Sequence, residues 1–202
     1  RQMCIRDRYI MKQFLTLNDL QNFDAQVALA KEIKTNPYQF EELGKRKTLG
    51  LLFFNPSLRT RLSTQKAGRL LGMDVMVMNF SNEAWAIEYE DKTIMEGLRS
   101  EHVKEATQVV SQYCDVVGIR AFATLTDKEK DESEQVLQKF IQYASVPILN
   151  MESATAHPLQ ALADALTLTE LSLPKKPKVV LPWAPHPKAL PHAVGNSFAR
   201  MM

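Results

Sequence analysis

Short apolar runs alternate along the chain with longer stretches in which apolar residues recur every three or four positions. Residues 49–54 form one such run, which is typical of a buried strand. Similar runs lie at residues 73–80, 115–119 and 147–150. Helical spacing predicts helices from Thr16 to about Ala30 and at residues 59–71, 101–113, 128–144 and 158–171. Strands that alternate with helices of this length indicate βαβ units, so we expect an α/β fold with a parallel sheet flanked by helices.

The last part of the chain predicts the start of a second α/β domain. Pro174-Lys175-Lys176-Pro177 is typical of a linker. Residues 178–183 then predict a strand, followed by a helix that begins near Ala189. We therefore expect a first domain over residues 11–157, an interdomain helix and linker over 158–177, and the start of the second domain over 178–202.

The two ends of the chain differ from the rest. Residues 1–10 show no periodicity, whereas Met11-Lys12-Gln13-Phe14 is typical of a natural start. We expect residues 1–10 to be an extraneous leader and exclude them from the fold. The chain stops at Met201-Met202, inside a predicted helix that has no C-cap signal, which favours a C-terminally truncated gene product.

Composition narrows the classes of function. Of 202 residues, 45% are hydrophobic and 24% are charged, and the net charge of +2 is too balanced for a typical nucleic-acid-binding surface. No apolar run approaches the roughly 20 residues of a membrane-spanning helix, and the first residues contain no apolar h-region, so we expect no secretion signal. Cys4 and Cys114 lack the spacing of a zinc site or a disulfide framework. We expect a cytoplasmic protein with no metal, no organic cofactor, and no nucleic-acid or membrane partner.

The stretch Phe53-Phe54-Asn55-Pro56-Ser57-Leu58-Arg59-Thr60-Arg61 predicts an anion site. Pro56 ends the first strand, and Ser57 is placed to cap a helix that starts at Arg59. Backbone N–H groups at a helix N-terminus attract anions, and Arg59 and Arg61 add charge and donors suited to phosphate oxygens. A surface cap with two solvated arginines explains the spacing about equally well. The spaced glycines and lysine of an NTP-binding P-loop do not occur here, so that class is not expected.

Two further strand ends carry candidate ligand-binding groups. Arg120 directly follows the third strand, and ligands of open α/β sheets bind at the carboxyl ends of strands, so Arg120 can face the same crevice as Ser57. After the fourth strand, His157 precedes Pro158, a favoured first helical residue, and Gln160 lies one turn along nearly the same face. A lone His-Pro pair is more often a cap. The pattern His-Pro-x-Gln-x-x-x-Asp after a strand is much more specific.

Three other positions have weaker signals. Trp85 lies in a polar, acidic stretch where a large apolar ring is unusual, although packing against its own domain is the simpler explanation. Glu152 more commonly supports a helix N-terminus than binds a ligand. His186 follows the predicted strand at 178–183, and together with His192 it makes a poor metal site because no carboxylate pattern accompanies the pair.

These motifs resemble the aspartate and ornithine transcarbamylase family. Ser57-Leu58-Arg59-Thr60-Arg61 resembles its carbamoyl-phosphate motif Ser-Thr-Arg-Thr-Arg, with Leu58 in place of the first Thr. His157-Pro158-Leu159-Gln160 resembles its second motif His-Pro-Cys-Gln, with Leu159 in place of Cys. The resemblance runs from Met11 to the end of the chain and implies a carbamoyl-phosphate domain with the start of an amino-acid-binding domain. The family's later Leu-Cys segment and downstream lysine and arginine contacts do not occur in this sequence.

The resemblance implies a phosphate clamp at the first motif. Ser57, the backbone N–H groups of Leu58 and Thr60, and Arg59 would hold the phosphate. Arg61 would instead brace the turn through a carboxylate.

The resemblance also implies how the carbamoyl group is held. Arg120, His157 and the Thr60 hydroxyl would donate to its carbonyl oxygen, and Gln160 would hold its NH₂ group. The catalytic residues expected on this basis are Arg59, Arg120 and His157. Contacts to carbamoyl phosphate are expected from Ser57, Leu58, Arg59, Thr60, Trp85, Arg120, His157, Pro158, Leu159 and Gln160.

Three residues point to an N-acylated ornithine as the second substrate. In the N-acylornithine branch of the family, a Trp matching Trp85 enters the neighbouring subunit's site, and residues matching Glu152 and His186 contact the amino acid. The resemblance therefore implies a homotrimer that carbamoylates the side-chain amine of an N-acylornithine in arginine synthesis.

The acyl group is harder to assign. In the loop at residues 97–101, Glu marks the acetyl branch and Pro the succinyl branch, but Ser100 beside Glu101 settles neither. The two motifs favour N-succinyl-L-ornithine, with N-succinyl-L-citrulline and phosphate as products. The alternatives are N-acetylornithine or ornithine as the acceptor, and an inactive fragment that only binds carbamoyl phosphate.

Overall fold

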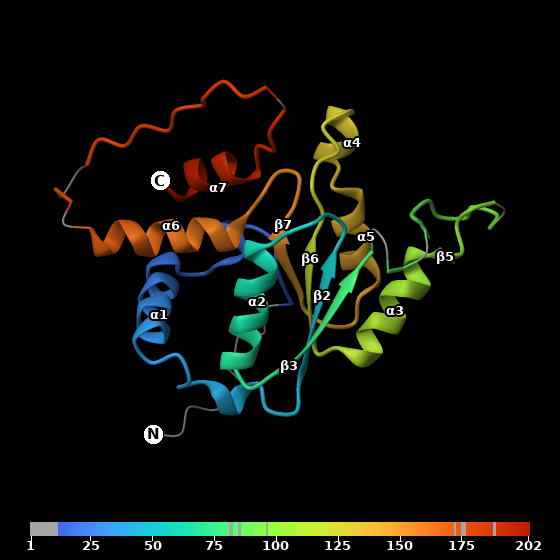
Figure 1. Ribbon diagram of the computed structural model, residues 1–202, viewed down its shortest axis with the longest axis horizontal. Helices are drawn as coiled ribbons and strands as arrows, with labels where there is room; N and C mark the ends of the chain where they lie inside the picture. The colour runs from blue at the N-terminus through green and yellow to red at the C-terminus, as the bar shows by residue number, and fades with distance from the viewer. Residues whose placement is uncertain are drawn as a thin grey trace.

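Figure 1 shows the computed structural model, which describes residues 12–80, 83–84, 86–95, 97–171, 173–174, 177–187 and 189–202. The expected leader at residues 1–10 lies outside the described residues. The centre is a five-stranded sheet in the order β1-β7-β6-β2-β3, in which every neighbouring pair is parallel. Its strands are β1 (Gln13–Phe14), β2 (Thr48–Phe53), β3 (Asp74–Asn79), β6 (Val116–Arg120) and β7 (Ile148–Glu152). The predicted α/β fold with a parallel sheet is confirmed.

Helices cover both faces of this sheet and give a three-layered molecule (Figure 1). On one face lie α2 (Arg59–Leu70) and α6 (Pro158–Glu170), with α1 (Phe23–Thr35) packed against α6. On the other face, α3 (Val103–Tyr113) packs against α5 (Gln135–Tyr143). Because both faces are covered, β2 is buried from Leu49 to Phe53. Continuous apolar runs, rather than alternating ones, are the expected pattern for such strands.

A cluster of three aromatic rings packs beneath the carboxyl ends of β2 and β3. Phe54 and Phe80 directly follow these two strands, and their ring centroids lie 4.8 Å apart. Phe140 of α5 meets both rings edge-on, at centroid distances of 5.8 and 6.1 Å. The cluster therefore anchors the edge of the sheet at which a ligand of an open α/β fold is expected to bind.

The four strands predicted in the first domain are present, within a few residues of their predicted bounds. Three short strands were not predicted: β1, which pairs with β7, and β4 (Ile87–Glu88) and β5 (Glu101–His102), which form a separate parallel pair. Each of the three has two residues, which is too short for any hydrophobic period to be recognised.

Two predicted helices differ from the observed ones. The helix predicted from Thr16 is a short 3-10 helix at Leu17–Asp19, capped by Thr16, followed by α1, which is capped by the Asn22 side chain. The helix predicted over 128–144 breaks into α4 (Lys128–Glu132) and α5, because Glu134 adopts a left-handed conformation with φ of 48°. A further 3-10 helix covers Glu41–Leu43.

The strand predicted at residues 178–183 is wrong. This segment belongs to the extended connection between α6 and α7 and pairs with no strand among the described residues. Its backbone groups therefore lack the hydrogen bonds to a neighbouring strand that define a β-strand. The helix predicted near Ala189 begins later, as α7 (Ala193–Met201), because Pro191 disfavours helical geometry at the preceding residue. α7 packs against α6 (Figure 1). The division into two domains stays a prediction.

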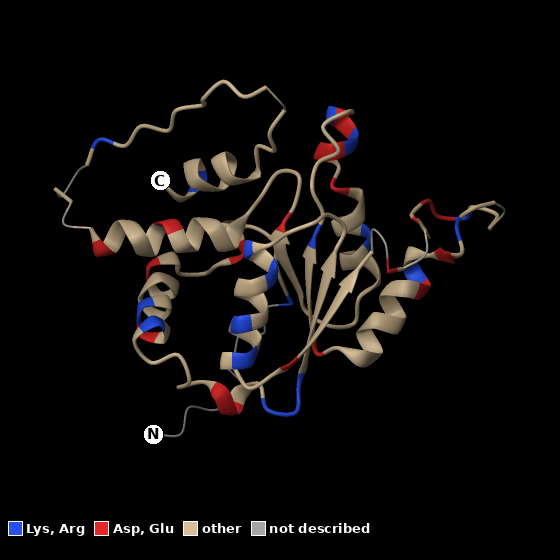
Figure 2. Cartoon of the chain, in the orientation of Figure 1, with Lys and Arg blue, Asp and Glu red and all other residues tan. Residues whose placement is uncertain are grey.

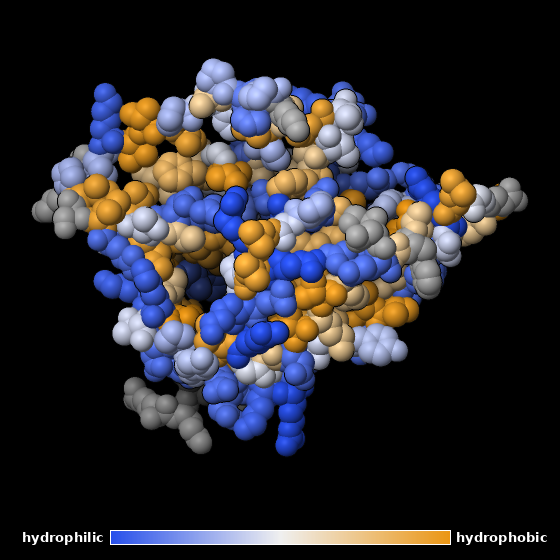
Figure 3. Space-filling view, in the orientation of Figure 1, coloured by the Kyte–Doolittle hydropathy of each residue, from blue (hydrophilic) through white to orange (hydrophobic). Residues whose placement is uncertain are grey.

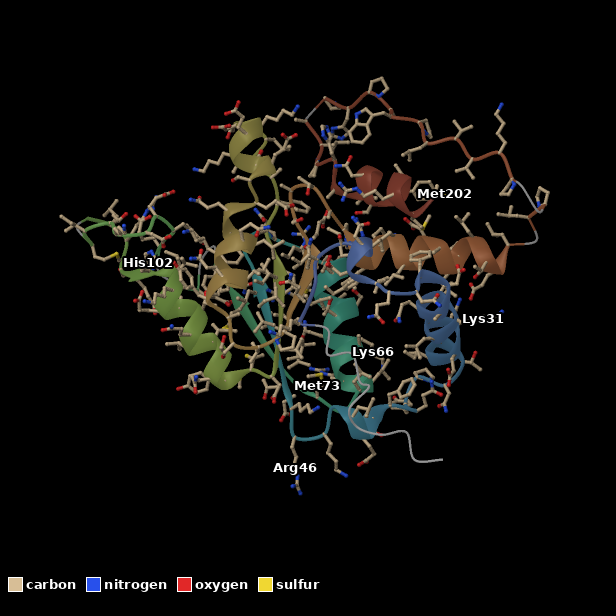
Figure 4. The ribbon with its side chains drawn as sticks, turned by 180° about the vertical axis from the view of Figure 1, so that it is seen from behind. Lys31, Arg46, Lys66, Met73, His102 and Met202 are labelled. Atoms are coloured by element: carbon tan, nitrogen blue, oxygen red, sulfur yellow. The ribbon has the colours of Figure 1, made fainter. Side chains whose placement is uncertain are left out.

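Charged residues gather at the strand ends and on the outer faces of the helices (Figure 2). The three cations at residues 45–47 are exposed at the amino end of β2, and Figure 4 places Arg46 and Met73 at the end of the sheet opposite α4. Apolar residues are scattered over the visible face of the molecule (Figure 3). Two of the most exposed are Val180, in the connection between α6 and α7, at 71%, and Ile94, between β4 and β5, at 76%. No helix among the described residues has the length and apolar character to cross a bilayer.

Replacing Phe140 by alanine should destabilise the fold strongly. Phe140 is fully buried in the aromatic cluster, so Phe140→Ala removes buried apolar surface and leaves a cavity that costs about 3–5 kcal/mol. Urea denaturation measures the loss. Tyr113→Ala, at a ring that is 68% exposed, is the matched control and should change stability little. Similar losses for the two variants would contradict the assignment of the core.

Candidate functional site

A cleft of about 940 Å³ opens at the carboxyl ends of β2, β6 and β7, and α2 and α6 form its walls. Nine of the residues predicted to bind substrate line it: Ser57, Leu58, Arg59, Thr60, Arg120, Glu152, His157, Leu159 and Gln160. Pro158 is buried as the first residue of α6. Trp85 lies outside the described residues. The structure thus brings the two sequence motifs and Arg120 to one cleft.

The N-terminus of α2 presents backbone donors to this cleft. The helix begins at Arg59, as predicted, but the prediction that Ser57 caps it is wrong: Leu58 is the cap residue, and it makes no side-chain capping hydrogen bond within the described part of the chain. The first N–H groups of a helix lack intrahelical acceptors, and leucine carries no acceptor to replace them. Because Arg59 is exposed at the same turn, this end of α2 is suited to an anion.

Arg61 does not line the cleft. Its guanidinium donates to the Asn79 side-chain oxygen and lies 5.1 Å from the centroid of the Phe53 ring. Arg61 therefore braces α2 against the ends of β2 and β3, as expected, but through an amide oxygen rather than a carboxylate. Glu83 accepts from the backbone N–H of Asn79 at 2.9 Å, and hydrogen bonds from Asn79 lower the pKa of Glu83.

Arg120 ties three strand ends together. Its Nε donates to Glu152 Oε2 at 3.2 Å, and its Nη2 lies 3.1 Å from the same oxygen in an ion pair, which joins β6 to β7. Its Nη1 donates to the carbonyl oxygens of Asn55 and Pro56, at 3.3 and 3.0 Å, in the turn after β2. The guanidinium also stacks on the Phe122 ring, with Cζ 3.9 Å from the ring centroid. All three guanidinium nitrogens of Arg120 thus have a protein oxygen nearby, and Arg120 also lines the cleft.

Burial and pairing act against each other in the Arg120–Glu152 contact. Burial lowers the pKa of the Arg120 guanidinium, and Glu152 beside it acts in the opposite direction. Burial raises the pKa of Glu152, while Arg120 and, more weakly, Arg59 favour its charged form. The pair therefore places a compensated cation at the floor of the cleft.

His157 is neutral at physiological pH. Its side chain is 12% exposed, and burial together with the neighbouring Arg120 cation lowers its pKa to about 4. His157 Nε2 lies 3.7 Å from Glu152 Oε2. Because the imidazole is neutral, this contact is not a salt bridge.

The position of His157 also determines its tautomer. His157 is the N-cap of α6, and its Nδ1 accepts from the Gln160 backbone N–H at 3.4 Å. We assign the proton of the neutral ring to Nε2, which faces Glu152 and the cleft, because Nδ1 is an acceptor. His157 is therefore both a helix cap and a neutral hydrogen-bond donor to the site.

Gln160 presents an acceptor to the cleft. Its Nε2 donates to Asp164 Oδ1, one turn along α6, at 2.8 Å. With the amide nitrogen directed to Asp164, its Oε1 is the atom left to accept a hydrogen bond from a ligand NH₂ group.

The structure places His186 apart from these groups. It lines a second cleft of about 560 Å³, together with Trp183, His192 and Asn196. The loop between β7 and α6 lies between the two clefts, since Thr155 lines the second and His157 the first. The expected contact of His186 with an amino-acid substrate stays a prediction, as does that of Glu152.

Two supporting residues were missed at the sequence level. The Asn55 side chain accepts from the Phe122 backbone N–H at 2.6 Å, which holds the turn after β2 against the end of β6. An Asn-Pro pair is a known turn signal, so Asn55 could have been found. Ser197 of α7 accepts from the His157 backbone N–H at 2.8 Å, and no local pattern indicates a contact between residues this far apart.

Comparison with known proteins identifies the family. Residues 12–170 match the carbamoyl-P binding domain of the aspartate/ornithine carbamoyltransferases. The chain is 48% identical over 192 residues to an N-succinylornithine carbamoyltransferase of Bacteroides thetaiotaomicron, with 95% of this chain and 60% of that protein covered. It is 41% identical over 192 residues to an N-acetylornithine carbamoyltransferase of Xanthomonas campestris pv. campestris, with 93% and 56% covered.

Solved structures of proteins from the same family have the same fold. A mutant N-acetyl-L-ornithine transcarbamylase complexed with carbamyl phosphate and N-succinyl-L-norvaline superposes with a TM-score of 0.85 at 40% identity, over 94% of this chain and 58% of that one. The chain belongs to the aspartate/ornithine carbamoyltransferase family. It spans about 60% of the length of the N-succinylornithine carbamoyltransferases that it matches.

Acid conditions are expected to destabilise the fold through His157. Its pKa is about 4 in the folded protein and 6.5 ordinarily, so between these pH values the unfolded chain binds a proton that the folded chain does not. The free energy of unfolding therefore falls as the pH is lowered from 6.5 towards 4, by up to about 1.4 kcal/mol per pH unit. Urea denaturation at a series of pH values measures this slope.

Two variants isolate the contribution of His157. His157→Gln removes the titrating ring and should flatten the slope between pH 6.5 and 4. Lys66→Ala removes an exposed cation on the outer side of α2 (Figure 4) and should keep the wild-type slope. Equal slopes in the wild type and His157→Gln would contradict the assignment.

Proposed function

We propose that this chain provides the carbamoyl-phosphate site of an N-acylornithine carbamoyltransferase. The observation that carries the proposal is the common cleft, in which the uncapped N-terminus of α2, Arg120 and the neutral His157 converge. A doubly charged phosphate and a polarised carbonyl need these two kinds of donor: positive charge at one end and directed hydrogen bonds at the other.

The phosphate is held at α2. Ser57, the backbone N–H groups of Leu58 and Thr60, and Arg59 surround it and stabilise it as the leaving group. The first turn of α2 supplies backbone donors, and Arg59 supplies charge.

The carbamoyl group points towards β6 and β7. Arg120, His157 Nε2 and the Thr60 hydroxyl donate to its carbonyl oxygen as negative charge develops there, while Gln160 Oε1 accepts from its NH₂ group. The deprotonated side-chain amine of the acceptor attacks the carbonyl carbon, the bond from that carbon to the phosphate oxygen breaks, and inorganic phosphate leaves. The amine loses its remaining extra proton to solvent or phosphate. Arg59, Arg120 and His157 are the catalytic residues on this proposal.

N-succinyl-L-ornithine is the proposed acceptor, and N-succinyl-L-citrulline the product, in arginine synthesis. The higher identity to an N-succinylornithine carbamoyltransferase, 48% against 41% for an N-acetylornithine enzyme, supports this choice. Glu152, already in the cleft, and His186, in the adjacent cleft, are the proposed contacts to the acylated amino acid. A homotrimer in which Trp85 enters a neighbouring subunit's site remains an expectation from the family resemblance.

A second candidate is binding of carbamoyl phosphate without turnover. One observation favours it: Ser57, Arg59, Arg120 and His157 all line the cleft, whereas the chain spans about 60% of the length of its N-succinylornithine relatives.

Replacing Arg59 by alanine should weaken the binding of carbamoyl phosphate about 10- to 100-fold, because a hydrogen bond to a charged group contributes roughly 1.5–3 kcal/mol. Isothermal titration calorimetry measures the change. Arg69→Ala, at an exposed arginine in the last turn of the same helix, is the control and should leave the affinity close to that of the wild type. Unchanged affinity in Arg59→Ala would remove this residue from the clamp.

A substrate panel separates the candidate reactions. With carbamoyl phosphate and equal concentrations of N-succinylornithine, N-acetylornithine and ornithine, we expect the N-succinylated product to form fastest, as quantified by mass spectrometry. Faster carbamoylation of either other amine would contradict the proposed acceptor. Saturable binding of carbamoyl phosphate without any product would instead support the second candidate.

A further inference from the structure

The loop at residues 153–157 joins β7 to α6 and ends at His157. It lies next to the break between α4 and α5, where Glu134 has φ of 48° and ψ of 40°. Residues with a Cβ rarely adopt this left-handed conformation, and they keep it only where surrounding contacts demand it. The charged helix predicted over 128–144 is interrupted at this residue.

The Glu134 carboxylate supplies these contacts. Its Oε1 accepts hydrogen bonds from Ser153 Oγ at 2.5 Å, from the Thr155 backbone N–H at 2.9 Å and from Thr155 Oγ1 at 2.8 Å. No lysine, arginine or histidine among the described residues forms an ion pair with Glu134. The negative charge is therefore directed at the loop rather than at a cation, and hydrogen bonds to a charged acceptor are strong.

The Glu134 contacts continue into the interior. Ser153 Oγ, which donates to Glu134, accepts in turn from Asn150 Nδ2 at 3.0 Å and from the Ala156 backbone N–H at 3.3 Å. Asn150 is 1% exposed and also donates to the Leu15 carbonyl oxygen at 3.0 Å. The residues just before His157 are thereby held in one conformation by a connected set of buried and half-buried hydrogen bonds.

We propose that Glu134 is a positioning residue for the carbamoyl-phosphate site: its carboxylate holds the 153–157 loop so that His157 Nε2 faces the cleft. This inference rests on the proposed function and adds to it a residue that does not line the cleft. The left-handed backbone thus occurs at the residue whose carboxylate contacts the loop. The effect is carried from Glu134 through Ser153 and Thr155 to His157.

The environment of His157 reports on the loop directly, with no ligand present. In Glu134→Ala the loop loses three hydrogen bonds, water gains access to the ring, and the pKa of His157 should rise from about 4 towards 6.5. The charged groups that face His157, namely Arg120, Glu152 and Asp164, remain in every variant. Titration of histidine ¹⁵N signals by NMR measures the pKa, and the signal missing in His157→Gln identifies the ring.

Two variants distinguish positioning from a general loss of charge. Glu134→Gln replaces the carboxylate by an amide whose oxygen can accept the same hydrogen bonds. The pKa of His157 in this variant should therefore lie between that of the wild type and that of Glu134→Ala. Glu129→Ala removes an exposed carboxylate of α4 and should leave that pKa unchanged. If Glu134→Ala does not fold, Ser153→Ala and Thr155→Val each remove one hydroxyl donor and should raise the pKa in the same direction.

Calorimetry with carbamoyl phosphate connects the loop to the site. Glu134→Ala should weaken binding about ten-fold, which is the order expected when a well-placed donor is lost, and Glu134→Gln should weaken it less. An unchanged pKa of His157 in folded Glu134→Ala, or in both Ser153→Ala and Thr155→Val, would overturn the inference. Failure of the wild type to bind carbamoyl phosphate would overturn the proposed function instead, and the NMR titration would still decide the role of Glu134.

Discussion

The contact on which the cleft depends is the buried pair between Arg120 and Glu152. Arg120 is the last residue of β6 and Glu152 the last residue of β7. The Arg120 guanidinium also donates hydrogen bonds to the turn after β2, so this one side chain sets the spacing of three strand ends. Buried pairs of this kind contribute little net stability compared with apolar packing, but loss of one partner leaves an uncompensated charge. The pair therefore acts mainly as a constraint on geometry, while the aromatic cluster of Phe54, Phe80 and Phe140 supplies apolar burial at the ends of β2 and β3.

The same cation also acts on the neighbouring His157. Burial is the larger cause of the lowered pKa of His157, and Arg120 lowers it further by disfavouring a second positive charge. The site thus combines a permanent cation with a neutral donor, although both residues are nominally basic. A ligand with a charged end and a polar but neutral end suits such an arrangement better than one that is anionic throughout.

Sequence reasoning predicted the features that depend on local pattern. Continuous apolar runs predicted β2, β6 and β7 because these inner strands are largely buried, and a further run predicted the edge strand β3, which is only partly buried. Arg120 could be placed because strand ends meet at one edge. The His157-Pro158 pair predicted the start of α6 because proline suits a first helical position. These signals involve neighbouring residues and a regular geometry.

What could not be predicted depends on contacts between distant residues. The break at Glu134 follows from hydrogen bonds to Ser153 and Thr155, which a helical period cannot reveal. The two-residue strands β1, β4 and β5 are recognised only by their pairing with other strands. The segment at 178–183 pairs with no strand among the described residues, so its apolar run does not form one. The cap of α2 also differs by one position, and the turn before it is held by a distant residue, because Arg120 donates to the Pro56 carbonyl oxygen.

The contact between α7 and His157 has a mechanical consequence. Ser197 accepts from the His157 backbone N–H, and Asn196 donates to the Thr155 carbonyl oxygen at 3.2 Å, so the loop at residues 153–157 is fastened to α7 as well as to the sheet. A rigid-body rotation of α7 would pull on the same short segment that carries the imidazole. Because Val194 of the same helix lines the cleft, a displacement of α7 would change both the shape of the cleft and the placement of the ring.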